Sequence, residues 1–238
     1  MTIRIAMWSG PRNISTAMMR SWENRSDTSV IDEPFYAYYL SQTQSPHPMF
    51  EEVLASQRQD YAEVAGELSC GECATGIQYQ KHMTHHMLND DFSWAKDLQH
   101  CFLIRNPAEV VNSYTNSRGV CTADDIGIVR QAEIFDILSD MTQQDIPVID
   151  SNEVLKNPEK VLSSLCQKLE LPFEQNMLHW PAGRRDSDGV WASHWYHSVE
   201  QSTGFAPYQA KQLDLNDDQK RVVEEVMPAF LAMHDRIL

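Results

Sequence analysis

Short apolar runs alternate along this chain with segments whose apolar residues recur at helical spacing. The strand candidates are the runs 3–8, 29–31, 76–80, 101–104 and 146–149. Helices are predicted at 15–22, 35–40, 50–65 and 124–141, and further helices start after positions 106, 157 and 216. Buried strands joined by helical crossovers pair in parallel. We therefore predict an α/β fold of three layers, a parallel sheet with helices on both faces.

The composition fits a single domain that covers residues 1–238, with 42% apolar and 22% charged residues. No run approaches the roughly 18 consecutive apolar residues that cross a bilayer, and the first residues enter a strand without a signal-peptide pattern. A cytoplasmic protein without a membrane partner is expected. The net charge of -15 disfavours nucleic acid, yet a few local cations suffice for a small polyanion. Five cysteines predict no disulfide framework, and the oligomeric state is not predicted.

The loop between the first strand and the first helix is the most informative segment. Such a loop aims unpaired backbone N–H groups at one point, where the helix dipole favours an anion. Gly10 lets the backbone approach a ligand, Arg12 suits phosphate oxygens, and Ser15 or Thr16 is the expected N-cap. We therefore predict a phosphate site in a fold of the P-loop nucleotide-binding type. Its predicted contacts are Gly10, Pro11, Arg12, Asn13, Ile14, Ser15 and Thr16.

The loop departs from the nucleotide-triphosphatase pattern GxxxxGK[ST]. Ile14 stands where that pattern has its glycine and lysine, and no lysine precedes Ser15 and Thr16. We therefore expect phosphate binding without the usual lysine and magnesium arrangement. In the alternative, Ser15 only caps the helix and Arg12 faces solvent.

A second anion site is predicted after the run 101–104. Arg105 closes that strand, and Ser113 lies two turns into the helix that follows. Ligands of open parallel sheets bind beyond the carboxyl ends of the strands, so both residues should face the crevice of the first loop. An arginine and a hydroxyl there can clamp a separate phosphate through charge-assisted hydrogen bonds. In the alternative, Arg105 pairs with the nearby Glu109.

Together these segments resemble the sulfotransferases that use 3′-phosphoadenosine 5′-phosphosulfate (PAPS). In that family a strand, loop and helix hold the 5′-phosphosulfate, and a later Arg-x-Pro…Ser stretch holds the 3′-phosphate. The matching residues are Arg12, Ser15 and Thr16 in the first motif, and Arg105, Pro107 and Ser113 in the second. The ranges 148–153, 157–159 and 171–173 look like the family's later strand, acidic turn and helix.

The resemblance implies transfer of a sulfuryl group from PAPS, without a metal, to a hydroxyl or amine of a small acceptor. Many members have lysine where Arg12 stands. Arginine does not give up its proton, so Arg12 would act by stabilising charge on the leaving phosphate. Two rivals stay open: a P-loop nucleotide kinase or other phosphotransferase, for which Asp150 is the candidate magnesium ligand, and a non-catalytic nucleotide-binding protein with a degenerate phosphate loop.

Glu33 is the first candidate for the base that takes the acceptor proton. It follows the second strand on the ligand side, Pro34 fixes the turn, and related sulfotransferases carry a carboxylate in a similar place. Its structural alternative is a helix-entry carboxylate or a salt bridge. His82, which follows Lys81 at the end of the third strand, is the second candidate because histidine titrates near neutral pH.

The remaining features have weaker functional interpretations. Cys70 and Cys73 with the histidines at 82, 85 and 86 suggest a metal site, but the spacing does not match common zinc sites. His85 and His86 are expected on the surface of a short helix. The segment 179–208 is predicted to be a long loop over the site. Its aromatic residues either line a pocket for an apolar or sugar-like alcohol or pin the loop to the core; they are Trp180, Trp191, Trp195 and Tyr196.

Overall fold

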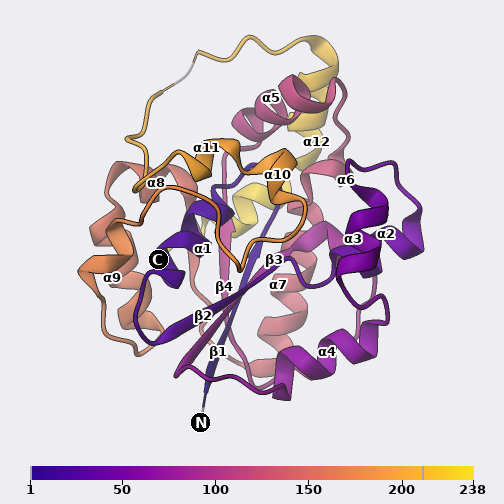
Figure 1. Cartoon of the computed structure of the whole chain (residues 1–238). Coiled ribbons are helices and arrows are strands. Elements are labelled where there is room, and N and C mark those ends of the chain that lie inside the picture. The colour runs from indigo at the N-terminus through magenta and orange to yellow at the C-terminus, as the bar shows by residue number, and fades with distance from the viewer. Residues whose placement is uncertain (1, 211) are drawn as a thin grey trace.

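The computed structural model describes residues 2–210 and 212–238. Five parallel strands form one sheet in the order β2-β3-β1-β4-β5. The strands are β1 (Ile3–Ser9), β2 (Thr28–Asp32), β3 (Ile77–Met83), β4 (Gln99–Ile104) and β5 (Val148–Asp150). Helices lie on both sides of this sheet (Figure 1). The predicted three-layer α/β fold and all five predicted strands are confirmed.

The helices connect these strands and also cover the carboxyl edge of the sheet. They are α1 (Ser15–Glu23), α2 (Tyr36–Thr43), α3 (Phe50–Ser56), α4 (Tyr61–Cys70), η1 (Thr84–His86), η2 (Ser93–Ala95), α5 (Pro107–Arg118), α6 (Ala123–Ile126), α7 (Ile128–Thr142), α8 (Ser151–Lys156), α9 (Pro158–Lys168), η3 (Gln175–Leu178), α10 (Ala192–Trp195), α11 (His197–Glu200) and α12 (Asp217–His234). Within the described ranges, no helix is long and apolar enough to span a bilayer.

The alternation of side chains along β1 produces two cores, one on each face of the sheet. Ile5 and Met7 pack with residues of α1, α8 and α9, whereas Ala6 and Trp8 pack with residues of α4, α7 and α12. All four side chains are fully buried. Burial of a side chain such as Met7 contributes about 1.5–3 kcal/mol relative to exposure, so β1 is held firmly from both sides.

Two predicted helices and one predicted N-cap differ from the structure, each for a local reason. The predicted helix 50–65 is two helices, because the Asp60 side chain accepts a hydrogen bond from the Glu63 N–H at 2.9 Å and caps a new helix there. The predicted helix 124–141 is interrupted at Gly127, which has a φ of +70°. The expected N-cap at Ser15 or Thr16 is wrong, since the N-cap position of α1 is Ile14, which is left-handed and makes no side-chain cap bond.

The register of the sheet decides which segments meet at its carboxyl edge. Ser9 at the end of β1 pairs with Met83 of β3 on one side and with Leu103 of β4 on the other. The loop 10–14 therefore stands between η1 and the residues that follow β4. The segment 179–208 is largely irregular, as predicted, and its two short helices α10 and α11 lie over this edge (Figure 1).

Candidate functional site

The loop after β1 is shaped by two left-handed residues that are not glycine. Arg12 has a φ of 61° and Ile14 a φ of 56°. Such conformations are uncommon for these residue types and collect at ligand-binding loops. The loop leads directly into the N-terminus of α1, where unpaired N–H groups favour an anion. The predicted contacts comprise an exposed Arg12, half-buried Pro11, Ile14 and Thr16, and buried Gly10, Asn13 and Ser15.

Gly10 is required by the packing of the loop. A Cβ atom at this position would lie 2.3 Å from the carbonyl oxygen of Ile126, closer than atoms can stand. The structure therefore gives Gly10 a packing role in the contact between the loop and α6, and its approach to a ligand stays a prediction.

Asn13 turns its side chain inward. Its Nδ2 donates to the carbonyl of Leu103 at 3.2 Å, and the Ser151 hydroxyl donates to the Asn13 carbonyl at 3.0 Å. These bonds join the loop to the ends of β4 and β5. Asn13 thus fixes the loop in place, and its amide is not presented at the surface of the loop.

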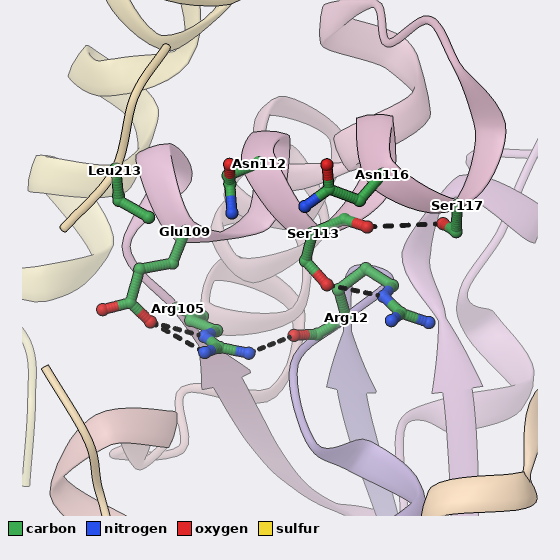
Figure 2. A pocket seen from close by; sticks show the side chains of 8 residues that line it. All are labelled: Arg12, Arg105, Glu109, Asn112, Ser113, Asn116, Ser117 and Leu213. Carbon is green, nitrogen blue, oxygen red and sulfur yellow. Dashed lines mark hydrogen bonds and ion pairs between the residues drawn. The ribbon is translucent and has the colours of Figure 1, made fainter. Parts of the chain in front are cut away.

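Arg12, Arg105 and Ser113 come together in one pocket of ≈ 330 Å³ (Figure 2). Arg12 Nε donates to Ser113 Oγ at 3.0 Å, and Arg105 Nη1 donates to the Arg12 carbonyl at 2.9 Å. The three residues arrive from the loop after β1, the end of β4 and α5. The predicted convergence of the two neighbouring strand ends is therefore present in the structure.

One face of α5 supplies most of the remaining wall. Glu109, Asn112, Ser113 and Asn116 recur at the spacing of a single helix face and point into the pocket (Figure 2). Leu213, from the segment before α12, lies at its rim. Neither asparagine was predicted from the sequence. Asn112 directly precedes Ser113 and Asn116 follows it by three residues, and this helical spacing would have indicated both.

The pocket carries more positive than negative charge. Arg105 Nη2 lies 2.8 Å from Glu109 Oε2, so the pairing considered as an alternative exists, while Arg105 still lines the pocket. Burial and the charge of Arg105 both lower the pKa of Arg12, although a guanidinium stays protonated at any accessible pH. Two cations face one carboxylate, in a chain whose net charge is -15.

Glu33 lies in a buried ionic cluster at the end of β2. Lys81 Nζ is 2.5 Å from Glu33 Oε1, 2.9 Å from Asp32 Oδ1 and 2.8 Å from the Tyr196 hydroxyl. Burial raises the pKa of Glu33, and the charge of Lys81 opposes that rise. The Glu33 side chain keeps 11% exposure. The salt bridge considered as its structural alternative is therefore present.

The same cluster holds the segment 179–208 on the sheet. Asp32 accepts hydrogen bonds from the Tyr196 hydroxyl at 2.7 Å and from the Gly189 N–H at 3.2 Å. Arg20 and Asp188 form an ion pair at 2.6 Å, and both side chains are fully buried. Buried ion pairs hold a segment firmly, since removal of one partner leaves an uncompensated charge.

The predicted aromatic residues of this segment divide between two roles. Trp191 Nε1 donates to the Tyr196 hydroxyl at 3.2 Å, and both residues are buried. Trp180 is buried against Phe205. These three pin the segment to the core. Trp195 is half-buried and is the remaining one available to line a site.

His82 lies in the core and not at the pocket. It is 1% exposed, and its ring stacks on Trp8 with centroids 4.3 Å apart. Burial lowers the pKa of His82 to about 3. Its Nε2 is 3.2 Å from Gln80 Oε1.

His85 and His86 are not the surface residues that the sequence suggested. His86 is 2% exposed and stacks between Tyr36 and Tyr39, with ring centroids at 4.6 and 4.9 Å. His85 is half-buried. Both histidines directly follow β3, at the carboxyl edge of the sheet, where the loop 10–14 also lies. Their position after a strand was the sequence feature that could have indicated a place near the site.

The cysteine pair lies at the other edge of the sheet. Cys73 Sγ is 3.4 Å from Ser29 Oγ and 3.2 Å from Thr75 Oγ1, beside the amino ends of β2 and β3. The metal interpretation joined Cys70 and Cys73 to histidines at the carboxyl ends, and the fold separates them. Within residues 2–210 and 212–238, no group of three or more potential ligands is placed to hold a metal ion. All five cysteines are free thiols.

Asp150 has a structural role at the start of α8. Its Oδ1 accepts hydrogen bonds from the backbone N–H groups of Asn152 at 2.7 Å and Glu153 at 3.1 Å. The carboxylate is thus an N-cap. The carboxylate that the kinase alternative would use as a magnesium ligand therefore caps α8 through Oδ1.

A family model matches almost the whole chain. Residues 3–237 match the sulfotransferase domain family. Branched-chain-amino-acid aminotransferase-like proteins 1 and 2 of Arabidopsis thaliana are 37% and 34% identical over 208 residues, which cover 85% and 86% of this chain. The chain spans only 36% of the length of either relative.

Solved sulfotransferase structures share the fold. A sulfotransferase domain from the curacin biosynthetic pathway superposes with a TM-score of 0.56 at 16% identity, over 95% of this chain and 98% of that one. A sulfotransferase from Alicyclobacillus acidocaldarius superposes with a TM-score of 0.54 at 11% identity, over 100% of this chain and 94% of that one. At these identities the likeness concerns the fold alone.

Proposed function

The chain belongs to the sulfotransferase family, and from this premise we propose that it transfers a sulfuryl group from PAPS to a hydroxyl or amine of a small acceptor. One observation supports the choice of donor above the others. Arg12 and Arg105 follow neighbouring strands and line a single pocket with Ser113. Two cations from two strand ends suit a nucleotide that carries phosphates at both its 5′ and 3′ positions.

In this proposal the loop and Arg12 hold the 5′ end of PAPS, while Arg105 and Ser113 hold the 3′-phosphate. Both arginines already donate hydrogen bonds across the pocket, to the Ser113 hydroxyl and to a loop carbonyl. A phosphate would exchange with these partners and with the carboxylate of Glu109. Ser117, on the same wall of α5, adds a hydroxyl.

The reaction needs little covalent chemistry from the protein. The acceptor oxygen or nitrogen forms a bond to sulfur as the bond from sulfur to the phosphate oxygen breaks. The electron pair of that bond stays on the leaving 3′-phosphoadenosine 5′-phosphate (PAP), and the acceptor proton passes to a base. Positioning and charge stabilisation dominate such transfers. Arg12 supplies the positive charge beside the leaving phosphate.

Glu33 remains our first candidate for the base, and the geometry ranks it above His82. The Glu33 carboxylate keeps 11% exposure at the carboxyl end of β2, whereas the His82 ring is enclosed by Trp8 and other aromatic residues. His85 becomes a further candidate by its position alone, because it is half-buried beside the loop, whereas burial lowers its pKa to about 3 and so weakens it as a base. A neutral imidazole can accept a proton.

A thermal-shift series with PAPS, PAP, AMP and magnesium-ATP tests this proposal, followed by transfer of radiolabelled sulfate from PAPS to a panel of phenols. Ligand at 100 times its Kd stabilises the folded protein by about 2.7 kcal/mol, so PAPS and PAP should raise the melting temperature and AMP much less. Glu33→Gln should lower kcat, and His82→Phe should leave it close to wild type.

Two outcomes would replace the proposal. Magnesium-dependent turnover of ATP would favour the phosphotransferase. Tight PAP binding without transfer to any acceptor, unaffected by Glu33→Ala, would favour a non-catalytic nucleotide-binding protein.

A further inference from the structure

A second polar cluster lies beside the loop, on the other side of α5 from the pocket. We call it the histidine cluster, and it comprises Tyr36, Tyr39, His47, His85, His86 and Arg118. Its members come from α2, the segment after α2, η1 and the last residue of α5. None of them belongs to the predicted nucleotide site.

Aromatic contacts hold the histidines of this cluster in place. The Tyr36 hydroxyl and His47 Nδ1 lie 2.8 Å apart. The rings of His85 and His86 have centroids 4.4 Å apart, and the Tyr39 ring stands perpendicular to His85 at 5.5 Å. The Nδ1 atoms of His85 and His86 are buried and have no hydrogen-bond partner among the described residues. Buried polar atoms without partners are rare and call for an explanation.

Arg118 supplies the positive charge of this cluster. Its guanidinium carbon lies 4.6 Å from the centre of the Trp195 ring, and the side chain is half-buried. Over the part of the chain that the structure describes, Arg118 forms no ion pair. An unpaired, partly desolvated guanidinium favours an anionic partner.

Asp125, which acts on Tyr114 together with Arg118, is occupied elsewhere. Asp125 Oδ1 accepts from the Tyr114 hydroxyl at 3.2 Å, and Asp125 Oδ2 accepts from the Thr122 N–H at 2.8 Å. Burial and the charge of Arg118 together lower the pKa of His47 to about 4. The cluster histidines are therefore neutral at neutral pH and do not compete with Arg118 for an anion.

The geometry of α5 separates this cluster from the nucleotide pocket. Ser113 and Arg118 are five residues apart, which places them about 140° apart around the helix and about 7.5 Å apart along it. Ser113 faces the pocket (Figure 2). Tyr114 and Arg118, four residues apart, share the other face. One helix thus borders both sites.

The loop that is proposed to hold the 5′ end lies next to the cluster. The Thr84 hydroxyl, one residue before His85, donates to the Ser9 carbonyl at 3.3 Å and to the Gly127 carbonyl at 3.0 Å. Gly10 packs on Ile126 in the same place. A group bound in the cluster would therefore stand on the side of the loop away from Arg105, where an acceptor must approach the sulfuryl group.

We infer that the histidine cluster binds the acceptor, and that this acceptor is a hydroxy acid whose carboxylate pairs with Arg118. This inference rests on the proposed function. The rings of Tyr36, Tyr39 and Trp195 suit an apolar or aromatic body between the hydroxyl and the carboxylate. The imidazole nitrogens of the cluster can donate a hydrogen bond to the acceptor hydroxyl or accept one from it.

Matched pairs of acceptors test the inference, because in each pair a neutral hydroxymethyl group replaces the carboxylate, and the sulfated position is identified by mass spectrometry. The first pair is 4-hydroxyphenylacetate and 4-hydroxyphenylethanol, and the second is 5-hydroxypentanoate and 1,5-pentanediol. Loss of a charge-assisted pair should raise KM for the acids by about 10- to 100-fold in Arg118→Gln. The neutral twins should change less than about threefold, and Arg118→Lys should recover part of the loss.

Arg130→Gln is the matched control, since Arg130 is also an arginine near a helix but pairs with Asp90 and Glu133 on the surface. It should leave both acceptors of each pair unaffected. Binding of the acids is also measured by saturation-transfer NMR, with and without PAP, so the result does not depend on turnover.

Equal effects of Arg118→Gln on acid and neutral twin, or no preference of the wild-type protein for either acid, would overturn the inference. Weaker PAP binding in Arg118→Gln would also overturn it, because Arg118 would then serve the nucleotide, and the proposed function would stand. Arg118-dependent binding of the acids without PAP binding or transfer would support the carboxylate site and refute the proposed function.

Discussion

Lys81 offers the sharpest test of how the carboxyl edge of the sheet is held together. Its ammonium group is 1% exposed and pairs with both Asp32, at 2.9 Å, and Glu33, at 2.5 Å. Lys81→Met keeps most of the volume and leaves two buried carboxylates without a counterion. Removal of one partner from a buried ion pair costs about 3–5 kcal/mol. In a chain of this size the melting temperature should fall by about 6–20 °C.

The assay is urea unfolding followed by tryptophan fluorescence, with Lys156→Met as control. Lys156 pairs with Glu153 at the surface, 47% exposed, so its loss should cost less than about 1 kcal/mol. Burial raises the pKa of Glu33 and Lys81 opposes it, so the variant should have a still higher folded pKa. A carboxyl with a folded pKa above its unfolded value stabilises at low pH and loses that contribution as pH rises. The difference between variant and wild type should therefore shrink from pH 7 to pH 5. A loss below about 1 kcal/mol, or a difference that grows toward pH 5, would refute this reasoning.

Other perturbations probe the loop, the buried histidines and the cysteine pair. Gly10→Ala should cost about 1–3 kcal/mol in calorimetry because the new Cβ meets a carbonyl at 2.3 Å, whereas Gly66→Ala, with no neighbour within 4 Å in a helix, should stabilise by up to about 1 kcal/mol; equal effects would contradict the packing argument. Burial lowers the pKa of His82 to about 3 and that of His100 to about 4, so the unfolded chain binds more protons below about pH 6.5 and stability should fall by up to about 1.4 kcal/mol per pH unit for each histidine. Urea titrations that show no change from pH 7 to pH 5 would speak against their neutrality. Burial raises the pKa of Cys73, but hydrogen bonds from neighbouring hydroxyls outweigh it and lower the pKa to about 7, so iodoacetamide should label this thiol ahead of the other four, as read by mass spectrometry.

The sheet could be predicted from the sequence because its strands are buried on both faces. The runs 3–8 and 101–104 are almost wholly apolar, and such runs between capped helices define a parallel sheet. The helix breaks were less readable, since they depend on single residues. Asp60 is one polar residue among several, yet its side chain starts α4. Gly127 ends α6 by adopting a φ of +70°.

The candidate site was predictable where it depends on strand ends and not where it depends on distant pairing. Arg12 and Arg105 follow neighbouring strands, so the topology alone brings them together. The partner of Glu33 is Lys81, which is 48 residues away in the chain. No local sequence pattern indicates this ion pair. The burial of His86 depends likewise on α2 folding back over η1.

The central claim is that two anion sites bind the 5′ and 3′ phosphates of one bisphosphorylated nucleotide. The most direct measurement is calorimetric binding of PAP and AMP to wild type, to Arg105→Ala and to Arg105→Ala with Glu109→Gln, which removes the carboxylate left behind. Loss of a charge-assisted pair is worth about 1.5–3 kcal/mol, so the PAP Kd should rise about 10- to 150-fold. The AMP Kd should change by less than about threefold in the double variant, because AMP lacks the 3′-phosphate. An equal loss for PAP and AMP would contradict the claim.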